Sequence, residues 1–333
     1  MSLPHLTQAQ APLTSEIDAV NEYGEVHKVS IPAERALTVY VDKRELVTLM
    51  TLGANPELLV LGYLRNQRLV KAVVDIESIT VDWDVGAAAV KTRHGIEDIE
   101  EKTAHRVVTT GCGQGSVFGG LMDEVDQIEL PANACITQSQ LYGLVNSIRL
   151  KETTYKSAGS VHACALFSTA SDEPEMLLFV EDVGRHNAID TIAGWMWMQQ
   201  EMAPTLVASR TALPPEGADL AWGGPALRPL APTLFASENA DAASPPSVTG
   251  GLVFYTTGRL TSEMVIKSAQ MGVAVVVSRS GITQMGHQVA HSVGLCAIGR
   301  ATNKRFLCYT HAERLTLQAG LVIKPDIKST QEA

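Results

Sequence analysis

The sequence lacks any apolar run long enough to cross a membrane. Its longest runs, "ELLVLGYL" and "GVAVVVS", are far shorter than the roughly 18 residues that a membrane-spanning helix needs. The N-terminus, "MSLPHLTQAQAPLTSEIDAV", also lacks the basic segment and apolar core that mark a secretory signal. We therefore expect a cytoplasmic protein with no part in the membrane.

Disulfide and nucleic-acid-binding signatures are absent as well. The chain has 5 cysteines, an odd number at irregular spacing, which does not suggest a disulfide framework and fits a reducing cytoplasm. Lys and Arg number 26 against 36 Asp and Glu, for a net charge of −10. A net acidic chain is a poor candidate for non-specific nucleic-acid binding, although it can still hold an anion in a local basic pocket.

What the sequence does contain is enough apolar material for a substantial core. Of 333 residues, 45% are hydrophobic and 19% are charged, which predicts one large domain or two of ordinary size. Alternating strand and helix patterns favour a layered α/β sheet. The predicted parts are a flexible N-terminal arm (1–25), a small α+β domain (26–105), a larger α/β domain (106–320) interrupted by a Pro/Ala/Gly-rich insertion (203–248), and a tail (321–333).

Several elements are predicted in detail. In the small domain, two strands flank a turn at Asp42–Lys43, and a helix begins at Pro56 behind Asn55 as a plausible cap. In the larger domain, "GLVFYT" and "VAVVVSRS" are predicted as strands. The helix "LTSEMVIKSAQM" is expected to end at Gly272, and "TQMGHQVAHSV" at Gly294.

Glycine is concentrated around one cysteine. In "RVVTTGCGQGSVFGG", residues 106–120, Cys112 lies among five glycines. Glycines permit positive φ angles, and exposed N–H groups in such a loop can stabilise an anion, including a thiolate. An exposed, mobile cysteine can also reach two partners in turn, as a sulfur carrier must. The alternative is a tight turn with an incidental buried cysteine. Because position 115 is glycine, a local disulfide or zinc knuckle is excluded here.

Loops that join strands to helices carry arginine. "VEDVGRHNAID" places Arg185 and His186 where a helix begins, and "YTTGRLTSEM" places Arg259 in a similar position. "SRS" adds Arg279 after the next strand. Helix starts favour anions, and ligands of open α/β sheets bind beyond the carboxyl ends of the strands. These glycine patterns match neither G-x-G-x-x-G nor a Walker loop, so they predict a generic anion site. Solvent-facing arginines beside a capped helix are the alternative.

The stretch "GRATNKR", residues 299–305, reverses the local sign of charge. It puts Arg300, Lys304 and Arg305 on one predicted turn, where they can hold a phosphorylated ligand. A solvated hairpin turn is the alternative.

The other cysteines and one histidine carry weaker signals. His162 begins a strand, and a lone histidine of this kind is more often structural than a ligand. Cys164, Cys296 and Cys308 lie in apolar strands and are expected in the core. Cys135 begins a helical region, and its role stays open.

Taken together, these blocks resemble one family. "TTGCG", "GSVHACALF", "EDVGRHNAID", "GRLTSEMVIKSAQMGVAVVVSRS" and "YTHAERL" occur in the order typical of the formate dehydrogenase accessory sulfurtransferases, the FdhD family. The resemblance covers roughly residues 30–315, apart from 203–248. It implies a cytidine-deaminase-like three-layer α/β/α domain with a smaller N-terminal α+β domain.

The resemblance also implies an activity. Family members take persulfide sulfur from a cysteine desulfurase and pass it to the molybdenum (or tungsten) bis-guanine-dinucleotide cofactor before that cofactor serves formate dehydrogenase. A homodimer, transient cofactor binding and no permanent metal are expected. The persulfide cysteine maps onto Cys112, and the guanine-dinucleotide segment maps onto Arg300, Ala301, Thr302, Asn303, Lys304 and Arg305. Arg185, His186 and Arg259 are our further candidates for cofactor binding, and His186 or His162 for proton transfer.

The chain departs from the family in two places. Many members have C-x-x-C in the glycine loop, whereas Gly115 replaces the second cysteine here, so a single persulfide carrier is expected rather than a dithiol. The 203–248 insertion is also unusual.

Two other functions compete with this hypothesis. A deaminase-type zinc hydrolase needs H-x-E and P-C-x-x-C, but His162 is followed by Ala163 and Cys164, and the chain has no C-x-x-C. A non-catalytic chaperone of the molybdenum cofactor would share the arginines but would not need Cys112.

Overall fold

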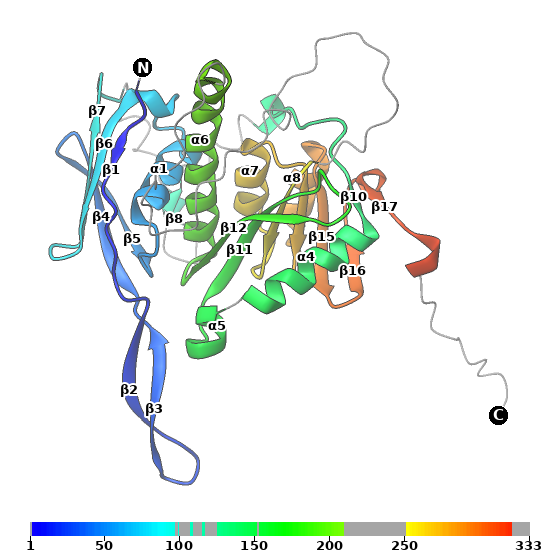
Figure 1. Cartoon of the computed structure of the whole chain (residues 1–333), viewed down its shortest axis with the longest axis horizontal. Coiled ribbons are helices and arrows are strands. Elements are labelled where there is room, and N and C mark those ends of the chain that lie inside the picture. Colours follow the sequence, from blue (N-terminus) through cyan, green and yellow to red (C-terminus); the bar gives the residue numbers. More distant parts are fainter. Residues whose placement is uncertain are drawn as a thin grey trace.

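The computed structural model describes residues 2–96, 99, 107–108, 115–116, 125–151, 153–209 and 251–321 (Figure 1). Two sheets carry most of the fold, and helices α1 and α6 lie between them in Figure 1. Cys112 and residues 210–248 and 322–333 lie outside the described residues. The short strands β8 (Val107–Val108) and β9 (Gly115–Ser116) pair on either side of the Cys112 position.

The first sheet has the order β1-β6-β7-β4-β5. Its strands are β1 (His5–Leu6), β4 (Arg35–Val41), β5 (Arg44–Thr51), β6 (Ile76–Asp82) and β7 (Ala87–Thr92). The predicted turn at Asp42–Lys43 is confirmed: both residues have positive φ angles, 47° and 73°, as the tightest hairpins require. Helix α1 (Pro56–Asn66) begins behind Asn55 as predicted, although the Asn55 side chain makes no capping hydrogen bond. A short 3₁₀ turn, Val73–Asp75, leads into β6.

The N-terminal segment differs from its prediction. Residues 1–25, expected as a loose arm, instead contribute β1 to the first sheet and β2 (Thr14–Val20) to a hairpin with β3 (Val26–Pro32). The hairpin register sets Ile17 opposite Val29, so apolar side chains from both strands share one face. The prediction overlooked this because polar residues separate the apolar positions. In Figure 1 the hairpin extends away from the body of the molecule.

The second sheet has six strands in the order β12-β11-β13-β14-β15-β16. They are β11 (His162–Ser168), β12 (Glu175–Asp182), β13 (Leu252–Thr256), β14 (Val275–Ser278), β15 (Cys296–Thr302) and β16 (Arg305–Cys308). The three central strands β13, β14 and β15 are parallel, and the outer pairs are antiparallel. A further short pair joins β10 (Ile136–Thr137) to β17 (Leu315–Thr316).

Helices cover both faces of this sheet (Figure 1). Helices α6 (Arg185–Ser209), α7 (Ser262–Gln270) and α8 (Gln284–Ser292) pack on one face, which includes Leu166 and Phe254. Helix α4 (Gln138–Lys151) packs on the other face against Phe167 and Tyr255, and α5 (Thr153–Ala158) follows it. Adjacent strand residues alternate between these two cores because strand side chains have a period of two. Shorter 3₁₀ turns span Val125–Gln127, Ala312–Arg314 and Ala319–Leu321.

The predicted α/β class and its helix ends are confirmed. Gly272 and Gly294 follow α7 and α8 with positive φ angles of 75° and 73°. Helix α6 continues to Ser209, seven residues into the predicted insertion. Likeness to the cytidine deaminase fold stays a prediction. None of the helices in the described ranges is long and apolar enough to span a bilayer.

Glycines bring two of the helices into backbone contact. A Cβ atom on Gly62 of α1 would lie 1.7 Å from the Asp190 carbonyl oxygen of α6. A Cβ atom on Gly194 of α6 would lie 2.1 Å from the Leu58 carbonyl oxygen of α1. Side chains of α6 also enter two cores, since Met196 packs with the second sheet and Trp197 with the first.

Candidate functional site

Four arginines lie near the carboxyl ends of neighbouring strands, and we call them the strand-end rim. Arg185, Arg259 and Arg279 follow β12, β13 and β14 respectively. Arg300 lies near the end of β15. These strands run in the same direction, so their carboxyl ends share one edge of the sheet. Hydrogen bonds tie the loops together there. Ser278 Oγ donates to the Gly258 carbonyl at 2.7 Å, and the Arg300 N–H donates to the Ser280 carbonyl at 2.7 Å. The structure therefore gathers arginines that are far apart in the sequence.

Three predicted residues lie close enough to His162 to affect it electrostatically. The pKa of His162 is lowered from its ordinary value, first by burial and then by the positive charges of Arg185, His186 and Arg259. Arg185 is buried, with 5% of its surface exposed, and its Cδ lies only 2.7 Å from where a Cβ on Gly258 would be. Gly258 therefore leaves the space that Arg185 occupies. Arg259 and Arg279, by contrast, face solvent.

A buried carboxylate organises the start of α6. Asp182 accepts hydrogen bonds from the N–H of Gly184 at 3.0 Å and from Asn187 Nδ2 at 2.8 Å. It also accepts from Thr51 Oγ1 at 2.5 Å and from the N–H of Leu52 at 3.2 Å. Thr51 is the last residue of β5 in the first sheet, and Leu52 follows it. Burial raises the pKa of Asp182, and these hydrogen bonds partly offset that effect. Asp182 thus fixes the turn that carries Arg185 and joins it to the first sheet.

A chain of buried charges runs from the rim into the interior. His186 Nδ1 lies 3.3 Å from Glu263 Oε1, which lies 3.3 Å from Lys267 Nζ. Lys267 Nζ in turn lies 2.9 Å from Asp190 Oδ1, and Asn66 Nδ2 of α1 donates to the same carboxylate at 2.7 Å. Lys267 and Asp190 have no exposed surface.

Two charges of this chain, Lys267 and Glu263, stabilise each other. Burial alone would lower the pKa of Lys267, but the carboxylates of Asp190 and Glu263 raise it above the ordinary value. Burial alone would raise the pKa of Glu263, but Lys267 and His186 lower it to about 2. Both side chains are therefore charged near neutral pH, and His186 is positioned by a carboxylate that is itself held in place.

The 300–305 turn lies at the end of the same sheet. Residues Arg300 and Asn303 have positive φ angles of 51° and 52°, which turn the chain between β15 and β16. Tyr142 of α4 anchors the turn by donating its hydroxyl to the Lys304 carbonyl at 3.2 Å. Ala301 is buried, whereas the other predicted residues of the segment are exposed: Arg300, Thr302, Asn303, Lys304 and Arg305.

The described cysteines follow their predictions in part. Cys164 and Cys296 are buried as expected, but Cys308 is only half-buried, because β16 is an edge strand. Burial raises the pKa of Cys164 to about 12, so this thiol is not a nucleophile at neutral pH. Cys112, the predicted persulfide cysteine, lies outside the described residues.

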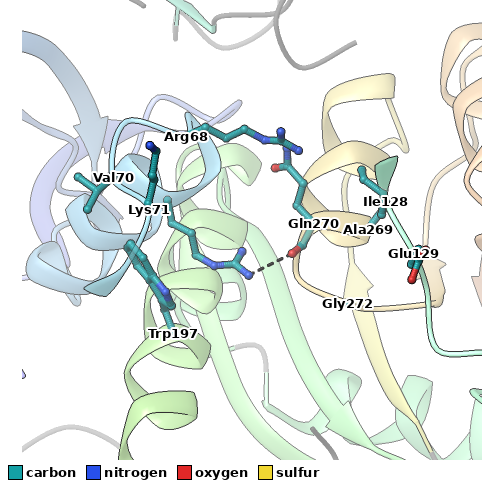
Figure 2. Close-up of a pocket in the computed structure, with 10 residues that line it drawn as sticks. Arg68, Val70, Lys71, Ile128, Glu129, Trp197, Ala269, Gln270 and Gly272 are labelled. Atoms are coloured by element: carbon teal, nitrogen blue, oxygen red, sulfur yellow. Dashed lines mark hydrogen bonds between the residues drawn. The ribbon is translucent and has the colours of Figure 1, made fainter. Parts of the chain in front are cut away.

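A cavity of about 670 Å³ lies at the C-terminal ends of α1 and α7 (Figure 2). No sequence motif indicated this place. Arg65 lines the cavity and donates to the Gln270 carbonyl at 3.0 Å, which joins the end of α1 to the end of α7. Burial, and secondly the charge of Arg68, lower the pKa of Arg65 to about 10. Lys71, Glu129 and Trp197 line other walls.

The sequence patterns missed the residues that hold the rim together. Thr256 and Ser278 end buried strands, and Glu263 and Lys267 resemble an ordinary exposed i,i+4 pair. No local sequence signal indicated their interior position, because it depends on Asp190 and His186, which approach from α6.

Fold and rim together define an α/β protein whose parallel strand ends present arginines at one edge. The sequence profile of the FdhD/NarQ family matches residues 32–212 and 247–316. The chain belongs to the FdhD/NarQ family.

Individual relatives agree with this assignment over nearly the whole chain. The sulfur carrier protein FdhD of Bacillus subtilis (strain 168) is 27% identical over 303 residues, which cover 88% of this chain and 94% of that protein. The sulfur carrier protein FdhD of Bacillus pumilus (strain SAFR-032) is 26% identical over 289 residues, covering 85% and 89%. Among solved structures, a protein described as a formate dehydrogenase accessory protein from Desulfotalea psychrophila has a TM-score of 0.61 at 18% identity, covering 91% of this chain and 100% of that one. This last likeness supports the fold.

Proposed function

We propose that this chain is a cytoplasmic sulfur carrier for formate dehydrogenase. It takes persulfide sulfur from a cysteine desulfurase onto Cys112 and transfers it to the molybdenum bis-guanine-dinucleotide cofactor. The observation that carries the proposal is similarity along nearly the full length to proteins named sulfur carrier protein FdhD. The family profile includes the segment that contains Cys112.

The loading step requires a thiolate. The Cys112 thiolate attacks the terminal sulfur of the donor's persulfide, forming a new S–S bond. The donor's own S–S bond breaks, and the donor cysteine leaves as a thiolate. Cys112 then bears the terminal sulfur, which it passes on to the cofactor. Glycine-loop N–H groups suit such a step because they stabilise a sulfur anion.

The strand-end rim suits the cargo. The cofactor carries two nucleotide arms with phosphate groups, and arginine binds phosphate with several hydrogen bonds at once. Arg259 and Arg279 are exposed on neighbouring loops, and Arg300 is exposed on β15 at the same edge. His162 has a lowered pKa and is therefore neutral at neutral pH, so it can accept a proton during transfer.

Intact-mass analysis tests the loading step. The full chain is incubated with a cysteine desulfurase and cysteine, and then its mass is measured without reductant. We expect a gain of one sulfur that disappears on reduction and is absent in Cys112→Ala. Cys135→Ala is the matched control and should still be loaded. Loading of Cys112→Ala to the wild-type level would refute the assignment of Cys112.

Formate dehydrogenase activity separates this proposal from its closest alternative. A non-catalytic cofactor chaperone would use the rim but not the cysteine. Cells that produce Cys112→Ala in place of the wild-type chain should contain inactive formate dehydrogenase. Full activity in those cells would favour the chaperone.

A further inference from the structure

Two cysteines outside the glycine loop lie in sulfur contact. Cys296 is on β15 and Cys308 is on β16, and their Sγ atoms are 3.8 Å apart. The strand register pairs Ile298 with Cys308, so Cys296, two residues before Ile298, points to the same face. The two thiols are therefore diagonal neighbours across adjacent strands.

The two thiols differ in exposure and in proton affinity. Cys296 has no exposed surface, whereas Cys308 is half-buried. The pKa of Cys308 is lowered to about 7, chiefly because the Cys296 thiol donates a hydrogen bond to it. The pKa of Cys296 is raised, first by that same hydrogen bond and then by burial. The accessible Cys308 sulfur therefore loses its proton more readily than the buried Cys296 sulfur.

We propose that Cys296 and Cys308 form a redox-active dithiol, which closes reversibly to an intramolecular disulfide by exchange with a small disulfide such as glutathione disulfide. This activity is separate from sulfur carriage on Cys112 and does not depend on it.

The exchange proceeds in two balanced steps. The Cys308 thiolate attacks one sulfur of glutathione disulfide, so a mixed disulfide forms and one glutathione leaves as a thiolate that takes up a proton. Cys308 has then lost its negative charge, and the main cause that raised the pKa of Cys296 is gone. Cys296 gives up its proton, attacks the Cys308 sulfur and releases the second glutathione. The protein is oxidised by two electrons, and glutathione disulfide is reduced to two glutathiones.

The position in the sheet favours a labile bond over a permanent one. Diagonal neighbours have Cα atoms about 7–8 Å apart, beyond the range of about 4.4–6.8 Å usual in relaxed disulfides. Closure must therefore shift β16 along β15, because the two cysteines are offset by two residues in the strand register. It can do so because β16 is an edge strand, paired on one side only. The strain makes the bond easier to reduce than a structural disulfide, which suits reversible use.

Closure of the bond would act on the predicted cofactor segment. The two cysteines lie on either side of the turn at Asn303 and Lys304. A covalent link between the strands would restrict the motion of that turn and shift its exposed cations, Arg300 and Arg305.

Peptide mapping after glutathione treatment tests the proposal. The reference is the full chain with Cys112→Ala, which removes the other reactive thiol that we expect. Incubation with glutathione disulfide should remove two free thiols and give a Cys296–Cys308 cross-linked peptide that dithiothreitol opens. Cys296→Ser should instead stop at a mixed disulfide and gain one glutathione on Cys308. Cys308→Ser should gain neither, and Cys164→Ser should react as the reference does.

Several results would overturn the proposal. One is a reference chain that keeps both thiols free in an excess of glutathione disulfide. Another is a cross-link that joins Cys135 to either partner. If a serine variant fails to fold, the reference chain still decides, because alkylation of its folded form must label Cys308 well before Cys296. Equal labelling of the two cysteines would also contradict the proposal.

Discussion

Replacing Gly62 with alanine will force α1 and α6 apart. The new Cβ would lie 1.7 Å from the Asp190 carbonyl oxygen and 2.7 Å from the Gly194 nitrogen, both backbone atoms. No side chain can rotate to relieve such contacts, so the helices must separate by more than an ångström. A gap of about 0.5–1 Å already forfeits a quarter to a half of the dispersion energy between the atoms that face it.

The expected loss follows from two opposing effects. Overpacking a well-packed core typically costs about 1–3 kcal/mol and sometimes more, and two backbone clashes place this site at the upper end. Alanine returns about 1 kcal/mol because it favours the helix more than glycine does. We expect a net loss of about 2 kcal/mol in the free energy of unfolding. Gly194→Ala should behave alike, and the double variant should lose less than the sum, because one separation relieves both clashes.

Urea unfolding followed by circular dichroism measures the effect. The matched control is Gly143→Ala in α4, where the nearest atoms are Pro174 side-chain carbons at 3.2 and 3.3 Å. There the helix preference should balance the mild contact and leave stability within about 1 kcal/mol of the wild type. If Gly62→Ala proves as stable as Gly143→Ala, the close approach of α1 and α6 is wrong.

Three further predictions concern the rim and its support. Glu263 has a pKa of about 2 in the folded chain against 4.5 ordinarily, so its contribution of roughly 3 kcal/mol to the free energy of unfolding is present above about pH 4.5 and is lost as the pH falls toward 2. In urea unfolding across that range, the free energy of unfolding should decline less steeply in Glu263→Gln than in the wild type. Parallel curves would contradict this. Asp182→Ala should lower the free energy of unfolding by about 3 kcal/mol, because it leaves the Leu52 and Gly184 N–H groups unpaired in the interior; a loss below about 1 kcal/mol in urea would show that these groups find other partners. Under the proposed function, Arg259→Ala and Arg279→Ala should each weaken the binding of guanosine diphosphate, a fragment of the cofactor, about tenfold as measured by calorimetry. The control Lys28→Ala, on the β2–β3 hairpin, should bind as the wild type does. Equal affinities in all three variants would show that the rim is not part of the cofactor site.

Local signals predicted the elements of the second sheet well. Glycine at the helix ends and apolar runs in the strands depend on a few neighbouring residues, so Gly272 and Gly294 could be assigned without knowledge of the fold. The hairpin of β2 and β3 escaped prediction because its apolar face forms only when two mixed strands pair. Its register, with Ile17 opposite Val29, is a property of the pairing and not of either strand.

In the candidate site, too, local sequence signals predicted some residues, whereas features that depend on distant segments escaped prediction. The motifs indicated Arg185 and Arg259, because loop arginines before a helix start are visible in the sequence. The depth of Arg185 could not be predicted, since it depends on the absent Cβ of Gly258, 73 residues further along. Likewise, Glu263 and Lys267 look like a surface pair in the sequence, and only the approach of Asp190 and His186 from α6 gives them an interior role.

The sharing of α6 between two cores has a consequence for how the chain can be divided. A fragment that ends near residue 105 would keep α1 and the first sheet but would lose Trp197, Met198 and the Asp190 partner of Asn66. The complementary fragment would present those same side chains of α6 to water. Neither half has a complete interior of its own, so we expect separate expression to give insoluble products. The chain should melt as one cooperative body even though it contains two sheets.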